Sequence, residues 1–174
     1  MELNSDAIKP YNGSAVNLLE NQPSLELTKW LPWNLNPGAI ERAVNRFMDE
    51  VDVKGDAEGF FNQTLQRIAG ATTGTPNQDF WMAVDGHEVA GYALASRVVD
   101  IDGSLCYWAS QAWVAPEFRH LPCVKEGYDR IFDRAKKLLC RYVILVSTRH
   151  HKAYCRFLGR GAHEYATLLK VNLP

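Results

Sequence analysis

The sequence predicts an α/β domain in which helices flank a mixed, mostly antiparallel central sheet. Apolar residues recur at helical spacing in several segments, and short runs rich in β-branched and aromatic residues lie between them. These two periodicities are typical of helices and of strands. Asp85-Gly86 and Asp102-Gly103 stand between neighbouring runs, and Asp-Gly favours a tight hairpin turn. The 174 residues fit one domain over 24–174, preceded by an extended N-terminal arm over 1–23.

The arm is rich in Asn, Ser and Pro, and its apolar patch covers residues 16–19. Such a segment buries too little area by itself to offset the entropy of becoming ordered. Residues 24–30 then alternate apolar and polar side chains, which predicts a first strand. Trp33 follows in a loop between two prolines, and aromatic side chains often anchor partners. We therefore expect protein partners that bind the arm and the Trp33 loop.

Two helices are expected next. Asn36 followed by Pro37 is a helix-start signal. Apolar residues then recur at helical spacing at Ile40, Val44, Phe47, Met48 and Val51. A second helix is predicted over 56–69, and the breaker-rich segment 70–78 is predicted to be a loop.

The rest of the chain completes the sheet. Strands are predicted over 79–84, 88–99 and 104–114, with the two Asp-Gly turns between them. A helix containing residues 128–138 follows, then a buried strand over 142–146, a helix over 152–158 and a last strand over 164–172.

The loop after residue 113 carries the most informative motif. It reads Val114-Ala115-Pro116-Glu117-Phe118-Arg119-His120-Leu121-Pro122-Cys123-Val124. This run resembles the Val-x-Pro-x-Tyr-Arg-Gly-x-Gly-x-Gly pattern of the GNAT (Gcn5-related N-acetyltransferase) superfamily, and the order of predicted elements is similar to the GNAT topology. The resemblance implies a GNAT-like acyl-CoA N-acyltransferase fold. It also implies that the cofactor-binding positions are Val114, Arg119, His120, Leu121, Cys123 and Val124.

Several chemically important positions depart from the family pattern. His120, Pro122 and Val124 replace its three glycines. Pro122 has no N–H to donate to a pyrophosphate, and side-chain bulk hinders the close approach of phosphates. Phe157 falls where the resemblance places a tyrosine that can protonate the CoA thiolate. Gln111 lies near the position of a carboxylate base in many GNAT enzymes, and an amide cannot accept a proton.

A second resemblance concerns the end of the chain. Arg156-Phe157-Leu158 and Gly161-Ala162-His163-Glu164-Tyr165 look like the C-terminal portion of a small internal virion and morphogenesis protein of short-tailed bacteriophages. That protein has an acetyltransferase-like sequence without the glycine loop. The resemblance implies a structural role in a virion or its assembly, without catalysis, in the host cytoplasm and the virion.

Two functional hypotheses stay open at this point. The first is a non-catalytic GNAT-fold protein for structure or interaction, which needs no cofactor. The alternative is an N-acyltransferase that uses acetyl-CoA on an amine of a small molecule or protein. Under the alternative Arg119 holds a phosphate, whereas under the first hypothesis it is a solvated arginine at a helix entry. The catalytic residues are unknown in both cases.

Composition excludes other classes of function. A formal net charge of −1 gives no electrostatic footprint for nucleic acid or a membrane surface. The four cysteines form no CxxC pair, so we predict reduced thiols and a cytoplasmic location. His150 and His151 are adjacent, but no third ligand is identifiable in the sequence. We therefore predict no metal site.

Overall fold

The computed structural model describes residues 25–29, 31–53 and 55–146, and beyond them residues 155, 156, 158, 159 and 161. Its elements are β1 (Glu26–Thr28), α1 (Ala39–Val51), α2 (Ala57–Thr72), β2 (Gln78–Asp85), β3 (Glu88–Val99), β4 (Leu105–Val114), the 3₁₀ helix η1 (Pro116–Phe118), α3 (Pro122–Lys137) and β5 (Tyr142–Leu145). The arm over 1–23 and the strand predicted over 164–172 lie outside the described residues. Of the helix predicted over 152–158, Cys155, Arg156 and Leu158 are described, and they are helical.

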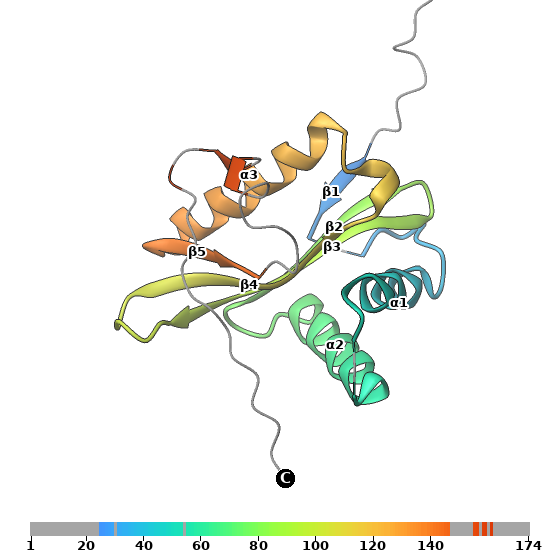
Figure 1. The fold of residues 1–174 in the computed structure, drawn as a ribbon, viewed down its shortest axis with the longest axis horizontal. Coiled ribbons are helices and arrows are strands. Elements are labelled where there is room, and N and C mark those ends of the chain that lie inside the picture. Colours follow the sequence, from blue (N-terminus) through green and yellow to red (C-terminus); the bar gives the residue numbers. More distant parts are fainter. Residues whose placement is uncertain are drawn as a thin grey trace, which may run out of the picture.

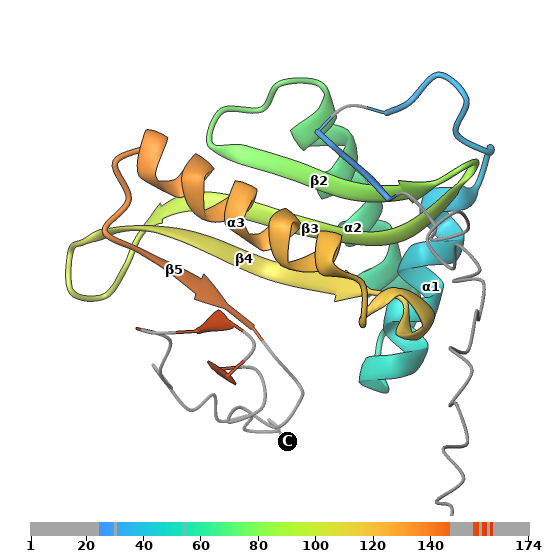
Figure 2. The ribbon, with the colours of Figure 1, turned by 90° about the horizontal axis from the view of Figure 1, so that it is seen from above.

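Within the described residues the sheet has five strands in the order β1-β2-β3-β4-β5 (Figures 1 and 2). The pairs β1–β2, β2–β3 and β3–β4 are antiparallel, whereas β5 pairs parallel to β4. The α/β class and the mixed, mostly antiparallel sheet predicted from the sequence are therefore confirmed. Gly86 and Gly103 have φ values of 59° and 79° in the two hairpin turns, a conformation that glycine adopts without strain.

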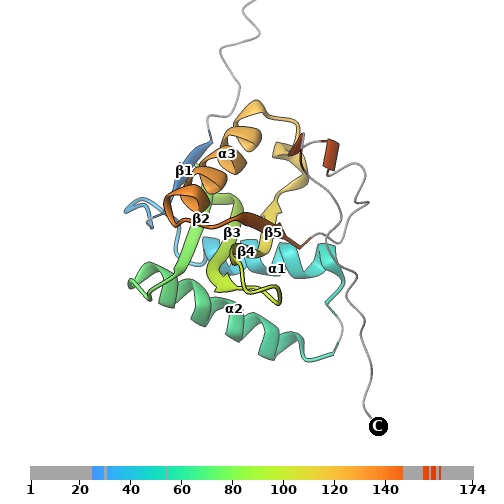
Figure 3. The same cartoon turned by 90° about the vertical axis from the view of Figure 1, so that its left-hand side faces the viewer.

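The molecule has three layers, with α1 and α2 on one face of the sheet and α3 on the other (Figures 1 and 3). In strand β2, successive side chains point to opposite faces of the sheet and pack into different cores. Phe80 and Met82 belong to the apolar core beneath α1 and α2, whereas Trp81 packs into the second core, which contains Ile131 of α3. Each fully buried side chain of this kind contributes about 1.5–3 kcal/mol.

Several predicted boundaries were wrong. Of the first strand, predicted over 24–30, Leu25 and Lys29 are described and lie outside β1. Helix α1 begins at Ala39 rather than at Pro37, because Gly38 adopts a left-handed conformation with φ 79° and the Asn36 carbonyl accepts the Ala39 N–H at 2.9 Å. Helix α2 continues to Thr72, so the first residues of the segment predicted as a loop are helical. Tertiary context outweighs the weak helix propensity of Gly70 here.

Candidate functional site

The loop between β4 and α3 consists of consecutive tight turns. Ala115 is fully buried and donates its N–H to the Ala90 carbonyl at 2.8 Å. The N–H of Phe118 then bonds the Ala115 carbonyl at 3.0 Å, and the N–H of Leu121 bonds the Phe118 carbonyl at 3.1 Å. The N–H of Val124 bonds the Leu121 carbonyl at 3.1 Å. These four backbone donors are therefore engaged inside the protein.

Helix α3 begins immediately after this loop, with Leu121 as its extended N-cap residue and Pro122 at its first position. Proline suits this position because its fixed φ matches a helix and its missing N–H would have no intrahelical partner. For a ligand at the helix N-terminus, however, the same residue removes one of the backbone donors that bind an anion.

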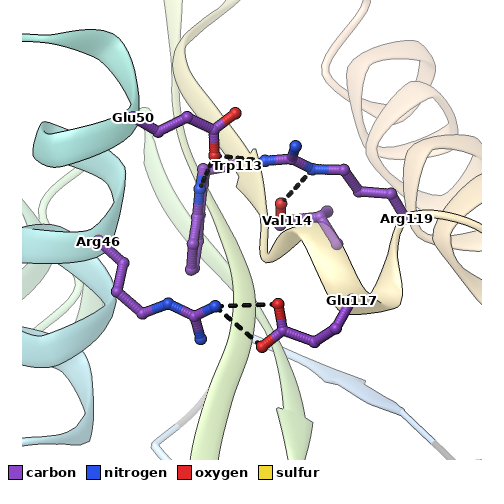
Figure 4. Close-up of polar contacts among 6 residues, drawn as sticks. All are labelled: Arg46, Glu50, Trp113, Val114, Glu117 and Arg119. Atoms are coloured by element: carbon purple, nitrogen blue, oxygen red, sulfur yellow. Dashed lines mark hydrogen bonds and ion pairs between the residues drawn. The ribbon is translucent and has the colours of Figure 1, made fainter.

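Arg119 is held by two groups that come from different layers of the fold (Figure 4). Its Nε donates to the Val114 carbonyl at 2.7 Å, and its guanidinium pairs with the Glu50 carboxylate at the end of α1. The Trp113 indole N–H donates to the same Glu50 oxygen at 2.9 Å. Arg119 thus links α1 to the end of β4.

A second ion pair lies beside the first. Arg46 of α1 donates to both carboxylate oxygens of Glu117 at 2.8 and 2.9 Å, and its guanidinium lies 5.4 Å from the Trp113 ring centroid (Figure 4). A backbone hydrogen bond within Glu117 and the bond from Arg46 hold the pKa of the Glu117 carboxyl below its ordinary value. Both bonds start from the same guanidinium nitrogen, Nη2, and they give α1 and the loop after β4 a second point of contact.

The other predicted site residues are distributed differently. His120 is exposed, and Leu121 is buried. Val114, Cys123 and Val124 are half-buried, and all three line one apolar pocket between the sheet and α3. The structure therefore brings these three residues together, while Arg119 is directed toward α1. Whether any of the six binds a cofactor stays a prediction.

Gln111 is an internal hydrogen-bonding residue. It is 7% exposed, its Oε1 accepts the Tyr92 hydroxyl at 3.0 Å, and its Nε2 donates to the Thr64 hydroxyl at 3.0 Å. Burial raises the pKa of Tyr92, so its hydroxyl stays protonated as a donor. The amide joins β3 and β4 to α2.

A buried ionic cluster on the α3 face of the sheet was not predicted from the sequence. Asp79 of β2 is 6% exposed and accepts hydrogen bonds from the Tyr107 hydroxyl at 2.6 Å and from Arg134 Nε at 3.0 Å. The Lys29 ammonium also pairs with it and lies 5.0 Å from the Trp81 ring centroid. An acidic residue at the start of an apolar strand was the available signal, since buried charges are normally paired.

The pairing of β4 with β5 covers only part of β4. It runs from Cys106 opposite Tyr142 to Ala109 opposite Leu145, and the Val146 N–H then bonds the Ala109 carbonyl at 3.4 Å. Strand β4 itself continues to Val114. Within the described residues, the last part of β4 therefore extends beyond its parallel partner.

The described part of the chain contains no group of three His, Cys, Asp or Glu residues placed to hold a metal ion. His150, His151 and Phe157 lie outside the described residues. As far as the structure describes the chain, no helix is both long and apolar enough to cross a membrane.

No protein-family model matches this sequence, and a search of curated protein sequences gives no match. Solved structures are similar over most of the chain. An aminoglycoside antibiotic 6'-N-acetyltransferase from Acinetobacter baumannii has a TM-score of 0.61 at 13% identity, covering 87% of this chain and 100% of the other. A glucosamine-6-phosphate N-acetyltransferase from Arabidopsis thaliana has a TM-score of 0.58 at 11% identity, covering 86% and 98%.

A transcriptional regulator from Bacillus halodurans has a TM-score of 0.59 at 13% identity, with 84% of this chain and all of the other covered. These similarities show that the chain has the fold of the GNAT acetyltransferases, as the sequence predicted. At such identities they define a fold and not an activity, because function depends on the site.

Proposed function

We propose that this protein uses the GNAT fold for structure or interaction and does not use acetyl-CoA as an acetyl donor. The observation that carries the proposal is the lack of free backbone donors at several positions of the loop between β4 and α3. Its N–H groups at Phe118, Leu121 and Val124 form internal hydrogen bonds, and Pro122 has no N–H to offer. A pyrophosphate needs convergent backbone donors at this place.

The internal contacts of the Arg119 side chain support the same proposal. The Arg119 Nε donates to the Val114 carbonyl and its Nη2 pairs with the Glu50 carboxylate, so a phosphate that needs either of these donors would displace an internal partner. A hydrogen bond to a charged group contributes about 1.5–3 kcal/mol, so each lost contact weakens binding by about one to two decades. The internal partners of Arg119 therefore compete directly with a ligand.

Isothermal titration with acetyl-CoA and with CoA tests the proposal. We expect no saturable binding up to millimolar ligand. Pro122→Gly restores one donor at the helix start, and Pro116→Gly is the matched control, since it replaces a proline of the same loop within η1. Micromolar binding by the unmodified protein would overturn the proposal, and a gain confined to Pro122→Gly would support its physical basis.

The narrower proposal is that the partner is another protein of a bacteriophage virion or of its assembly, with the chain located in the host cytoplasm and the virion. It is supported by the sequence resemblance of residues 156–165 and by the Trp33 loop. Trp33 is 97% exposed. The loop is fastened to the β2–β3 hairpin, because the Asn36 N–H bonds the His87 carbonyl at 3.0 Å and the His87 ring contacts the Asn34 carbonyl.

A fixed loop that presents an exposed indole suits a partner-binding role, because little conformational entropy is lost when the ring is buried. We expect Trp33→Ala to leave the free energy of unfolding within about 0.5 kcal/mol of the unmodified value. Under the narrower proposal, the amount of the variant found in purified virions should fall. Undiminished incorporation would remove Trp33 from the interface.

The second candidate function is acetyl-CoA-dependent N-acyl transfer, and the pairing of β4 supports it. Residues 110–114 of β4 extend beyond the pairing with β5 in the described structure. Apart from the Val114 carbonyl, which accepts from Arg119, this stretch offers main-chain groups to an extended ligand. The test is release of CoA from acetyl-CoA in the presence of a panel of amines. Measurable release, or its gain in Phe157→Tyr, would favour the enzyme over the structural protein.

A further inference from the structure

An apolar pocket lies between α3 and the sheet, next to β1, and holds about 60 Å³. Three strands line it with small residues, and Trp81 of β2 also lines it. The small residues are Ala83 of β2, Gly91 and Ala93 of β3 and Ala112 of β4. Its walls come from Cys123 to Ile131 of α3 on one side and from β1 on the other. Little of its surface is polar, so a chemically matched occupant is apolar.

The described chain enters the fold at the edge of this pocket. Leu25, the first described residue, lines the pocket, and so does Leu27. Leu27 also reaches α3, since a Cβ built on Gly127 would lie 3.8 Å from the Leu27 side chain. The residues that precede Leu25 are therefore tethered to the opening of the pocket.

The preceding segment has the required chemistry. Its apolar patch contains Val16, Leu18 and Leu19, and Asn21 and Pro23 between that patch and Leu25 are turn-forming residues. Six peptide units separate Leu19 from Leu25 and can span up to about 20 Å. The α3 wall of the pocket is only about 12 Å long at 1.5 Å per residue. The tether is therefore long enough for the chain to turn back.

We propose that residues 16–19 of the same chain fold back and fill this pocket in the free protein. Charge supports this occupant, because Glu20 follows the patch directly and Arg130 lies at the β1 edge of α3, where its Nη1 is 3.4 Å from the Leu27 carbonyl. The short tether also gives the arm a high effective concentration at the pocket. The proposal is independent of whether the chain transfers acyl groups. A partner that binds the arm must therefore first displace residues 16–19 from the pocket.

Alkylation of Cys123 reports occupancy, because its half-buried side chain lines the pocket. Iodoacetamide labelling of the full chain, quantified for each cysteine by peptide mass spectrometry, compares Leu18→Asp/Leu19→Asp with unmodified protein. We expect Cys123 to react about tenfold faster in the variant, as a pocket covered about nine-tenths of the time requires. Cys140, which packs beyond the far end of α3, should react at an unchanged rate and serves as the internal reference.

Asn17→Asp/Asn21→Asp is the matched control, since it adds the same charge to polar positions of the same arm, and we expect unmodified Cys123 labelling. A second measurement uses the thiol introduced by Leu18→Cys with diamide as the oxidant. We expect a disulfide to Cys123 within one chain. A crosslink between two chains would show that the arm of a second copy occupies the pocket. Equal Cys123 labelling in all variants, without any crosslink, would show that the arm does not occupy the pocket and that its ligand is another apolar group. Either result would overturn the proposal.

Discussion

Replacing Asp79 with Asn tests the buried ionic cluster that joins β2 to α3. The Asp79 side chain is 7% exposed, whereas those of Arg134 and Lys29 are 37% and 30% exposed. The substitution removes the negative charge and leaves two cations facing a neutral amide. Breaking a buried ion pair costs about 3–5 kcal/mol. Partial solvation of both cations reduces that cost, so we expect a loss of about 2–3 kcal/mol in the free energy of unfolding.

Urea unfolding followed by tryptophan fluorescence measures this loss. With a slope of about 2 kcal/mol/M for a domain of this size, the midpoint should fall by roughly 1–1.5 M. Asp133→Asn is the matched control, because Asp133 pairs with Lys136 at 3.0 Å on the surface, with side chains 63% and 77% exposed. We expect that control to change the midpoint by less than about 0.25 M. Equal shifts in the two variants would refute the reasoning.

The pH dependence of stability gives a second readout of the same cluster. Burial raises the pKa of the Asp79 carboxyl, but hydrogen bonds from Lys29, Tyr107 and Arg134 outweigh burial and hold it below its ordinary value of 3.8. A depressed pKa in the folded state stabilises the fold above the unfolded pKa. The contribution is therefore complete above 3.8 and is lost as the pH falls through the lower folded value. Asp79→Asn should lose less stability on acidification than unmodified protein, and parallel profiles would contradict this assignment.

Two further substitutions test tight contacts of the central strands. Gly91→Ala should lower the free energy of unfolding by about 1–3 kcal/mol, because overpacking of a tight contact forces the backbone apart; its Cβ would lie 2.8 Å from the Trp113 carbonyl oxygen. Gln111→Leu should cost about 2–4 kcal/mol, because it leaves the buried hydroxyls of Tyr92 and Thr64 without this partner. Urea midpoints measure both, and a change below about 0.5 kcal/mol would show that the strands relax or that water replaces the amide.

Local sequence signals predicted the sheet well because they act over few residues. The Asp85-Gly86 turn fixes the β2–β3 hairpin, whose register places Asp85 opposite Glu88. The predicted start of α1 was wrong because a contact with a distant element determines where the helix begins. The Asn36 N–H bonds the His87 carbonyl, so the loop is fastened to the hairpin before the helix begins. Nothing in the sequence around Asn36 reports that contact.

The candidate site was predictable only in part, for the same reason. Spacing identified the loop that contains Arg119, but Arg119 and its partner Glu50 are 69 positions apart in the chain. Asp79 and Arg134 are likewise 55 positions apart. Pairings of this kind depend on how helices stack on the sheet. A single sequence carries periodicity but no record of which charged side chains meet.

The chain shares a fold with acetyltransferases to which it is only 11–13% identical, which follows if alternation along the strands specifies the fold and the loops specify chemistry. Under the proposed function, one set of residues then accounts for both the lost cofactor site and a structural gain. Arg119, placed by the family resemblance on a phosphate, joins the end of β4 to Glu50 of α1. Releasing it for a ligand would also weaken that link. Restoring cofactor binding should therefore require changes at Glu50 and at Pro122 together, and each change alone should recover only part of the affinity.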